Sequence, residues 1–320
     1  MKIDLTDIDG ILVGHATNTE HRTGCTAVLC PSGIAASAYI CGFAPGCRET
    51  PLLEPTARVE EIHGLLLSGG SAFGLGAATG VVRWLTERGH GLDTGFAKVP
   101  IVPAAVVFDL NFNQSLGKPD EAMGYAAADA ASNGPVAQGN VGAGTGVTCG
   151  KLAGFDRAMK SGLGTDGMVS GDLQVAAMIA ANPVGDICNP DTGEIIAGVR
   201  NPDGNGLTGA NNVLAELATL IPSASTQNTM LGVVATNARM TKLQLARVAR
   251  MAATGIARAV RPAHMLYDGD IVFALATGKG PEADENMVGA MGADVLGRSI
   301  ANAALAAESV PGFPAARDLA

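Results

Sequence analysis

The sequence has few charged residues and no concentration of positive charge. Asp, Glu, Lys and Arg make up 16% of its 320 residues, and the formal net charge is −9, whereas about 25% of residues are charged in an average globular protein. Without a basic cluster to neutralise phosphates, non-specific nucleic-acid binding is not expected. The scarcity of charge favours a chain that buries much of its surface, in its own core or in an oligomer.

Long apolar runs and dense cysteine patterns are also missing. No segment approaches the roughly 20 apolar residues of a membrane helix, and the N-terminal residues mix acids with short apolar runs, unlike a signal peptide. The six cysteines are scattered, without a CxxC pair, and the five histidines form no HExxH pair. These absences predict a cytoplasmic, reduced protein without a metal site or a membrane partner.

What the chain has instead is apolar residues and glycine. Hydrophobic residues make up 47% of the sequence, which is enough for the core of a single large domain. The 43 glycines are roughly twice the usual share of about 7% and indicate many tight turns. Apolar runs predict strands at 34–40, 62–67, 230–236 and 271–277, and helical patterns predict helices at 119–131, 241–260 and 286–307, with Lys242 on a solvent face. The sequence therefore predicts an α/β fold.

Two glycine-rich stretches invite a comparison with nucleotide-binding loops. SGGSAFGLG, from Ser68, precedes a predicted helix, and GNVGAGTG follows another. Neither has the lysine spacing of a Walker loop or the context of a dinucleotide fingerprint. We therefore expect Ser68, Gly69 and Gly70 to line a substrate pocket with backbone groups.

The stretch TQNTMLGVVATNARM places Asn228 and Thr229 between the polar segment 222–227 and a predicted buried strand. A threonine hydroxyl needs a base, and cleavage before the residue would free its own α-amine for that purpose. A flexible segment before the bond and a rigid strand after it suit such a cleavage. An Asn-Thr dipeptide is also common in ordinary turns, so these residues alone do not decide the matter.

Several longer sequence motifs occur in a fixed order from about residue 10 to residue 305. They are GFAPGCRET, LLLSGGSAFGL, VGAGTGVTCGK, NPVGDI, NTMLGVVATNA and YDGDIVFALATG. Together they resemble the self-processing L-aminopeptidase/D-esterase family, which includes the β-peptidyl aminopeptidases and the nylon-oligomer hydrolase. The resemblance implies an αββα sandwich of the type shared with ornithine acetyltransferases. It further implies the general mechanism of N-terminal nucleophile hydrolases, in which cleavage exposes the catalytic residue. It also implies a single catalytic domain, cleaved into fragments 1–228 and 229–320, that needs no cofactor and assembles into homo-oligomers.

The same resemblance assigns roles to individual residues. Thr229 falls at the nucleophile position, Asp268 and Asp270 at the paired polar positions beside it, and Lys151 at a lysine near that centre. Asn182 matches the asparagine expected to donate to the oxyanion. Phe108 stands where relatives often carry a tyrosine facing the substrate, which puts efficiency and substrate preference in question.

The charges in this set can be weighed on physical grounds. Asp268 and Asp270 are two residues apart, so on an extended chain both side chains project to one side. Two adjacent carboxylates do not readily ionise together unless a nearby cation offsets their charge, and Lys151 or the Thr229 ammonium could do so. An Asp-Gly-Asp surface turn is the simpler interpretation of the motif alone. The direction of the α-amine pKa stays open, because the cation lowers it and the carboxylates raise it.

We therefore expect a hydrolase that cleaves amide bonds through an acyl-enzyme on Thr229. The carboxylate pair suggests substrates with a free ammonium group, such as short peptides, amino-acid amides or amino-acid oligomers. Two alternatives remain: an acyltransferase of the ornithine acetyltransferase type, and an uncleaved protein whose glycine loops bind a small anionic ligand.

Overall fold

The computed structural model of the chain describes residues 2–114, 117–217 and 228–319. The predicted linker at 222–227 lies outside these residues. None of the helices in the described part of the chain is both long enough and apolar enough to cross a bilayer.

A nine-stranded mixed sheet forms the centre of the molecule. Its strands are β1 (Leu12–Asn18), β2 (Thr23–Ile40), β3 (Cys47–Arg48), β4 (Glu61–Ser68), β7 (Ala104–Val106), β10 (Leu163–Ser170), β11 (Leu173–Asn182), β14 (Thr229–Thr236) and β16 (Ile271–Ala276). They follow the order β10-β11-β14-β16-β2-β4-β7-β3, and β1 pairs with β2 beside this path. Among the described strands of this sheet, the parallel pairs are β14 with β16 and β4 with β7.

The long strand β2 folds this sheet into two layers. Its first half pairs with β1 and β4, and its last six residues pair with β16. The pairing with β4 shifts register between Leu29 and Ile34, where Gly33 adopts a φ of +79°, a conformation that glycine reaches without steric cost. An apolar core fills the space between the layers and includes Val28 from one and Phe273 from the other.

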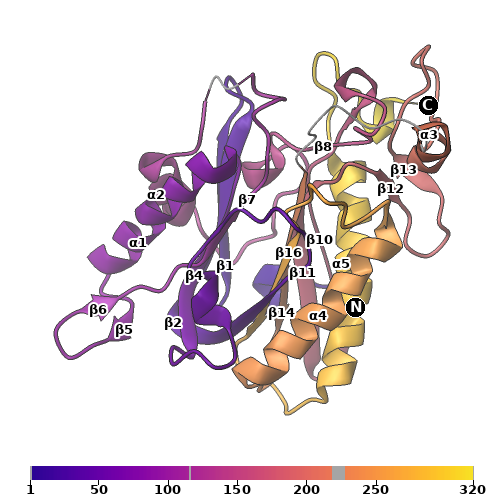
Figure 1. The fold of residues 1–320 in the computed structure, drawn as a ribbon. Helices are drawn as coiled ribbons and strands as arrows, with labels where there is room; N and C mark the ends of the chain where they lie inside the picture. The colour runs from indigo at the N-terminus through magenta and orange to yellow at the C-terminus, as the bar shows by residue number, and fades with distance from the viewer. Residues whose placement is uncertain (1, 115–116, 218–227, 320) are drawn as a thin grey trace.

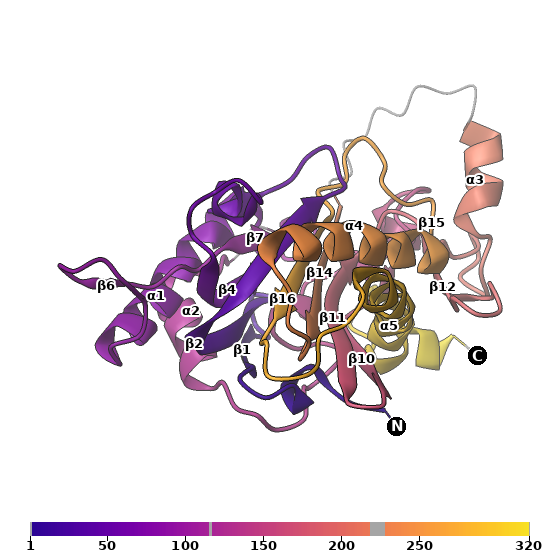
Figure 2. The ribbon, with the colours of Figure 1, turned by 90° about the horizontal axis from the view of Figure 1, so that it is seen from below.

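Helices cover the two outer faces, as Figures 1 and 2 show. α1 (Ala78–Glu87) and α2 (Glu121–Asp129) pack on the layer of β2 and β4 through a cluster that includes Leu66 and Val81. α4 (Lys242–Ala259) and α5 (Glu285–Ala306) pack side by side on the layer of β11, β14 and β16. Strand β14 alternates between the two cores, with Leu231 inward and Val234 toward the helices. The predicted αββα sandwich is confirmed.

Smaller elements surround the sandwich. They are α3 (Ala210–Leu217), the pair β5 (Leu92–Asp93) and β6 (Lys98–Val99), the pair β8 (Thr148–Cys149) and β9 (Met159–Lys160), and the three-stranded sheet of β12 (Asp186–Cys188), β13 (Ile195–Ala197) and β15 (Val260–Arg261). A hairpin turn at Asn189–Gly193 lies between β12 and β13 and is closed by the Gly193 N–H, which donates to the Asn189 carbonyl.

Two expectations about local structure were wrong. The strand expected at 34–40 begins at Thr23, because its glycine, cysteine and threonine residues give no clear alternation there. Lys242 is buried rather than solvated, with an exposed fraction of 3%. Its ammonium donates to the carbonyls of Ala57 and Val59 at 3.1 and 2.7 Å, contacts that helical periodicity cannot reveal.

Candidate active site

Three segments that are distant in the sequence meet at one end of the β11, β14 and β16 layer. Thr229 is the first residue of β14 and pairs with Asn182, the last residue of the antiparallel strand β11. The residue before it, Asn228, forms a parallel bridge with Asp268 in the loop that leads into β16. Strand pairing therefore brings the predicted nucleophile together with two of its predicted partners.

The carbonyl oxygen of Asn228 accepts two hydrogen bonds. Thr229 Oγ1 donates to it at 2.5 Å, and the backbone N–H of Gly269 donates to it at 2.8 Å. A Cβ atom at Gly269 would lie 2.6 Å from the Ala44 carbonyl oxygen and 3.0 Å from Thr229 Oγ1, so a larger residue would displace one of them. The bond between Asn228 and Thr229 thus has a hydroxyl and a backbone donor at its carbonyl.

The two aspartates have different partners. Asp268 accepts a hydrogen bond from the Met265 N–H at 2.7 Å. Burial raises the pKa of the Asp268 carboxyl to about 6, and the charge of Asp270 acts in the same direction. Asp270 Oδ1 accepts the Met230 N–H at 2.7 Å, and its Oδ2 lies 2.7 Å from His264 Nδ1. Asp270 therefore connects the residue after Thr229 to a histidine.

Lys151 and Asn182 form a second pair. Lys151 Nζ donates to the Asn182 side-chain oxygen at 2.7 Å and to its backbone carbonyl at 3.1 Å. The lysine is 1% exposed, and burial lowers the pKa of its ammonium to about 7, although Cys149, Asp268 and Asp270 oppose this shift. Burial therefore makes the charged form of this lysine less favourable than that of an exposed lysine.

The amide of Asn182 is oriented by three neighbours. Its Oδ1 accepts the Lys151 ammonium and the Thr148 N–H, and its Nδ2 donates to the Phe108 carbonyl oxygen at 3.0 Å. An asparagine amide carries two N–H donors. The hydrogen bond to the Phe108 carbonyl uses one of them. The Asn182 side chain therefore has a second N–H that can donate.

Of the residues expected to bind substrate, Phe108 contacts this centre, and the glycine turn at 68–70 contacts Asp109. Phe108 contributes its backbone carbonyl to Asn182, and its ring is half-buried. The Gly70 N–H donates to Asp109, the residue after Phe108, at 2.7 Å. Ser68 is fully buried and its hydroxyl donates to the Gly69 carbonyl. The glycine turn is therefore joined to Asn182 indirectly, through Asp109 and its neighbour Phe108.

Sequence reasoning missed His264. Its ring contacts Asp270, whereas the sequence pattern of the histidines bears only on metal binding. The sequence feature that points to His264 is its position shortly before the YDGD motif. An irregular loop joins His264 to Asp270, so no periodic pattern shows that the two side chains meet.

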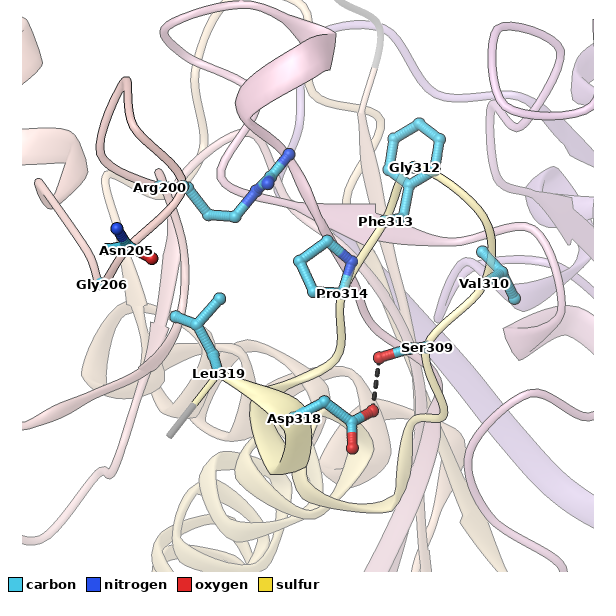
Figure 3. Close-up of a pocket in the computed structure, with 11 residues that line it drawn as sticks. Arg200, Asn205, Gly206, Ser309, Val310, Gly312, Phe313, Pro314, Asp318 and Leu319 are labelled. Carbon is cyan, nitrogen blue, oxygen red and sulfur yellow. Dashed lines mark hydrogen bonds between the residues drawn. The ribbon is translucent and has the colours of Figure 1, made fainter.

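A pocket of about 680 Å³ opens elsewhere, between the turn at Gly204 and the C-terminal segment (Figure 3). Arg200, Phe313 and Leu319 line it, together with the hydrogen-bonded pair of Ser309 and Asp318. It includes none of the residues singled out from the sequence.

Comparisons with known proteins cover almost the whole chain. The model of the family described as Peptidase family S58 matches residues 4–317. An uncharacterized aminopeptidase of Mycobacterium leprae (strain TN) is 39% identical over 347 aligned residues, which cover 97% of this chain and 92% of the relative. The 6-aminohexanoate-oligomer endohydrolase of Kocuria sp. (strain KY2) is 32% identical over 275 residues, covering 85% of this chain and 74% of that enzyme.

Two solved structures share the fold. The L-aminopeptidase D-Ala-esterase/amidase of Ochrobactrum anthropi, described as a variant among the Ntn hydrolase fold, superimposes with a TM-score of 0.71 at 21% identity, covering 99% of this chain and 91% of that one. A β-aminopeptidase of Burkholderia sp. gives a TM-score of 0.68 at 23% identity, with 96% and 87% coverage.

Proposed function

The chain belongs to peptidase family S58, and from this membership we propose that it is a self-processing amide hydrolase with Thr229 as its nucleophile. The observation that carries the proposal is the pair of donors, Thr229 Oγ1 and the Gly269 N–H, on the carbonyl oxygen of Asn228. These contacts support the proposal because they keep the attacking hydroxyl beside the bond to be cleaved, and the Gly269 N–H is a donor on the oxygen that would become negative.

The processing step follows from these contacts. Thr229 Oγ attacks the carbonyl carbon of Asn228, and the Gly269 N–H stabilises the negative charge that develops on the oxygen. The C–N bond then breaks, the hydroxyl proton passes to the Thr229 nitrogen, and an ester remains. Water hydrolyses this ester to release the Asn228 carboxylate and a Thr229 that carries both a free hydroxyl and a free α-amine.

Turnover uses the group that cleavage creates. The α-amine of Thr229 takes the proton of its own hydroxyl while Oγ attacks the amide carbonyl of the substrate. The ammonium so formed returns this proton to the leaving amine as the C–N bond breaks, and water then hydrolyses the acyl-enzyme to the acid and the free Thr229 hydroxyl. In this proposal Asp268 and Asp270 orient the α-amine, the remaining Asn182 N–H donates to the oxyanion, and Lys151 holds Asn182 in place and tunes the local charge.

The substrate class comes from the charge of the centre and from the relatives. Two buried carboxylates near the nucleophile favour a ligand with an ammonium group. Similar proteins are named as an aminopeptidase and as a 6-aminohexanoate-oligomer endohydrolase. We therefore propose short peptides, amino-acid amides and amino-acid oligomers as substrates, for cleaved protomers that assemble into homo-oligomers in the cytoplasm.

Intact-mass spectrometry under denaturing conditions tests the proposal. The parent protein should give fragments of 228 and 92 residues (320 − 228 = 92), and Thr229→Ala should give one chain because it lacks the attacking oxygen. Thr229→Ser keeps a hydroxyl and is the matched control, which should still be cleaved. A single intact chain in the parent after long incubation at neutral pH would contradict self-processing.

Activity assays then separate hydrolysis from acyl transfer. The cleaved parent should release free acid from amide substrates, and an added amine acceptor should leave the main product unchanged. A product that switches to the transferred acyl group would instead favour an acyltransferase.

A further inference from the structure

His264 links the Thr229 centre to solvent. Its Nδ1 lies 2.7 Å from Asp270 Oδ2, and the other oxygen of that carboxylate accepts the Met230 N–H at 2.7 Å. The Asp270 side chain is 2% exposed, whereas the His264 side chain is 26% exposed. One carboxylate thus joins a solvent-accessible imidazole to the backbone beside the nucleophile.

The backbone at His264 is held in an uncommon conformation. Its φ is +54°, in the left-handed region that few residues with a side chain adopt and that asparagine, aspartate and histidine populate more often than the others. The surrounding loop also closes on the aspartates, because the Asp268 N–H donates to the Met265 carbonyl and the Met265 N–H donates to Asp268. The loop therefore holds His264 in a left-handed conformation beside Asp270.

The charges around the imidazole explain why a histidine suits this place. Asp268 and Asp270 face it, and Lys151 and the Cys41 thiol interact with the same two carboxylates. Lys151 offsets the negative charges of Asp268 and Asp270 only in part, because burial lowers the pKa of its ammonium to about 7. The hydrogen bond to Asp270 raises the pKa of the His264 imidazole above its ordinary value, against the opposing effect of burial.

We propose that His264 is a positioning residue for the Thr229 centre: as an imidazolium it holds the Asp270 carboxylate and offsets its charge. The role rests on the proposed function, since it concerns the α-amine that cleavage creates. Two uncompensated carboxylates would stabilise the Thr229 ammonium, which cannot act as a base. The positive imidazolium weakens that effect and so leaves more α-amine in its neutral, reactive form.

The sign of the pH effect follows from this argument. The rise of kcat/KM on the acidic side reports deprotonation of groups in the free enzyme, among them the α-amine. His264→Asn keeps an N–H donor near the Nδ1 position and tolerates the positive φ, but it removes the charge. The acidic limb should therefore move to higher pH, by about one unit for the loss of a nearby charge.

Two further variants complete the activity experiment. His264→Gly also tolerates the positive φ but removes the donor, so kcat should fall further than in His264→Asn. His90→Asn changes a histidine that follows α1 on the other layer and serves as the matched control, whose profile should follow that of the parent. Intact mass and thermal unfolding of each variant check that it is folded and cleaved.

An NMR titration provides a readout that does not depend on activity. The His264 ring should titrate above its ordinary pKa in the parent, and Asp270→Asn should lower that pKa. An active parent whose acidic limb is the same in His264→Asn would overturn the proposal, as would a His264 pKa that does not respond to Asp270→Asn. A parent that is neither cleaved nor active would instead refute the proposed function and this role with it.

Discussion

At the scale of single residues, Lys151 shows how burial changes the chemistry of a side chain. Its ammonium donates to two oxygens of Asn182 and has almost no contact with solvent. The pKa of about 7 that results from burial makes the charge of Lys151 sensitive to its surroundings at neutral pH. Because the same ammonium orients the Asn182 amide, a change at Lys151 should directly affect the residue that we propose as the oxyanion donor.

Lys151→Met tests this connection with a side chain of similar length and no charge. We expect kcat/KM to fall by about 10²-fold or more, because an unsupported Asn182 no longer presents its N–H to the oxyanion. Lys242→Met is the matched control, since Lys242 is also buried and also donates to backbone carbonyls. It follows the far end of β14, so its kcat/KM should stay near the parent value. Equal losses in the two variants would contradict a specific role for Lys151.

At the scale of secondary structure, α4 and α5 approach each other through small residues. A Cβ atom at Gly255 in α4 would lie 2.2 Å from the Ala293 carbonyl oxygen of α5. Because that oxygen belongs to the backbone, it cannot move aside as a flexible side chain could. Both helices pack on β14, which begins at Thr229, and on β16, which begins directly after Asp270.

Gly255→Ala should therefore destabilise the protein, by about 1 to 3 kcal/mol, even though alanine favours a helix interior by about 1 kcal/mol. Urea unfolding measures the change. Gly76→Ala is the control, because a Cβ atom at Gly76 meets nothing within 4 Å, and its stability should equal or exceed that of the parent. A Gly255→Ala protein as stable as this control would show that the helices can separate at low cost.

At the scale of the whole molecule, the two predicted fragments are interleaved. Fragment 229–320 contains β14, β16, α4 and α5. In the sheet, β14 pairs with β11 and β16 pairs with β2, so two strands of the short fragment lie between strands of the long one. Both apolar cores of this layer include residues from the two fragments.

Cleavage should consequently leave the fragments together. We expect the cleaved protein to elute from a sizing column as a single species at neutral pH, containing both fragments in equal amounts. Only a denaturant should separate them, because separation exposes both apolar cores and leaves backbone N–H and C=O groups of β11, β14, β16 and β2 unpaired. Elution of the short fragment by itself in plain buffer would contradict this expectation.

Local pattern accounts for much of the fold but not for the site. The apolar runs predicted β4, β14 and β16, and the helical patterns predicted α2, α4 and α5 to within a few residues. The first half of β2 was missed, because its glycine and cysteine residues lack a clear alternation. The site residues came from the family resemblance rather than from pattern, and their catalytic roles remain predictions.

The amino-acid sequence by itself specifies the strands, the helices and the residue types available for chemistry, because these depend on neighbours a few positions apart. Tertiary structure decides which of these residues meet. The register of β11 against β14 places Asn182 opposite Thr229, and this register is set by which faces of both strands enter the apolar cores. The meeting of His264 with Asp270, and the burial of Lys151 and Lys242, depend on loops and layers that fold back from distant parts of the chain.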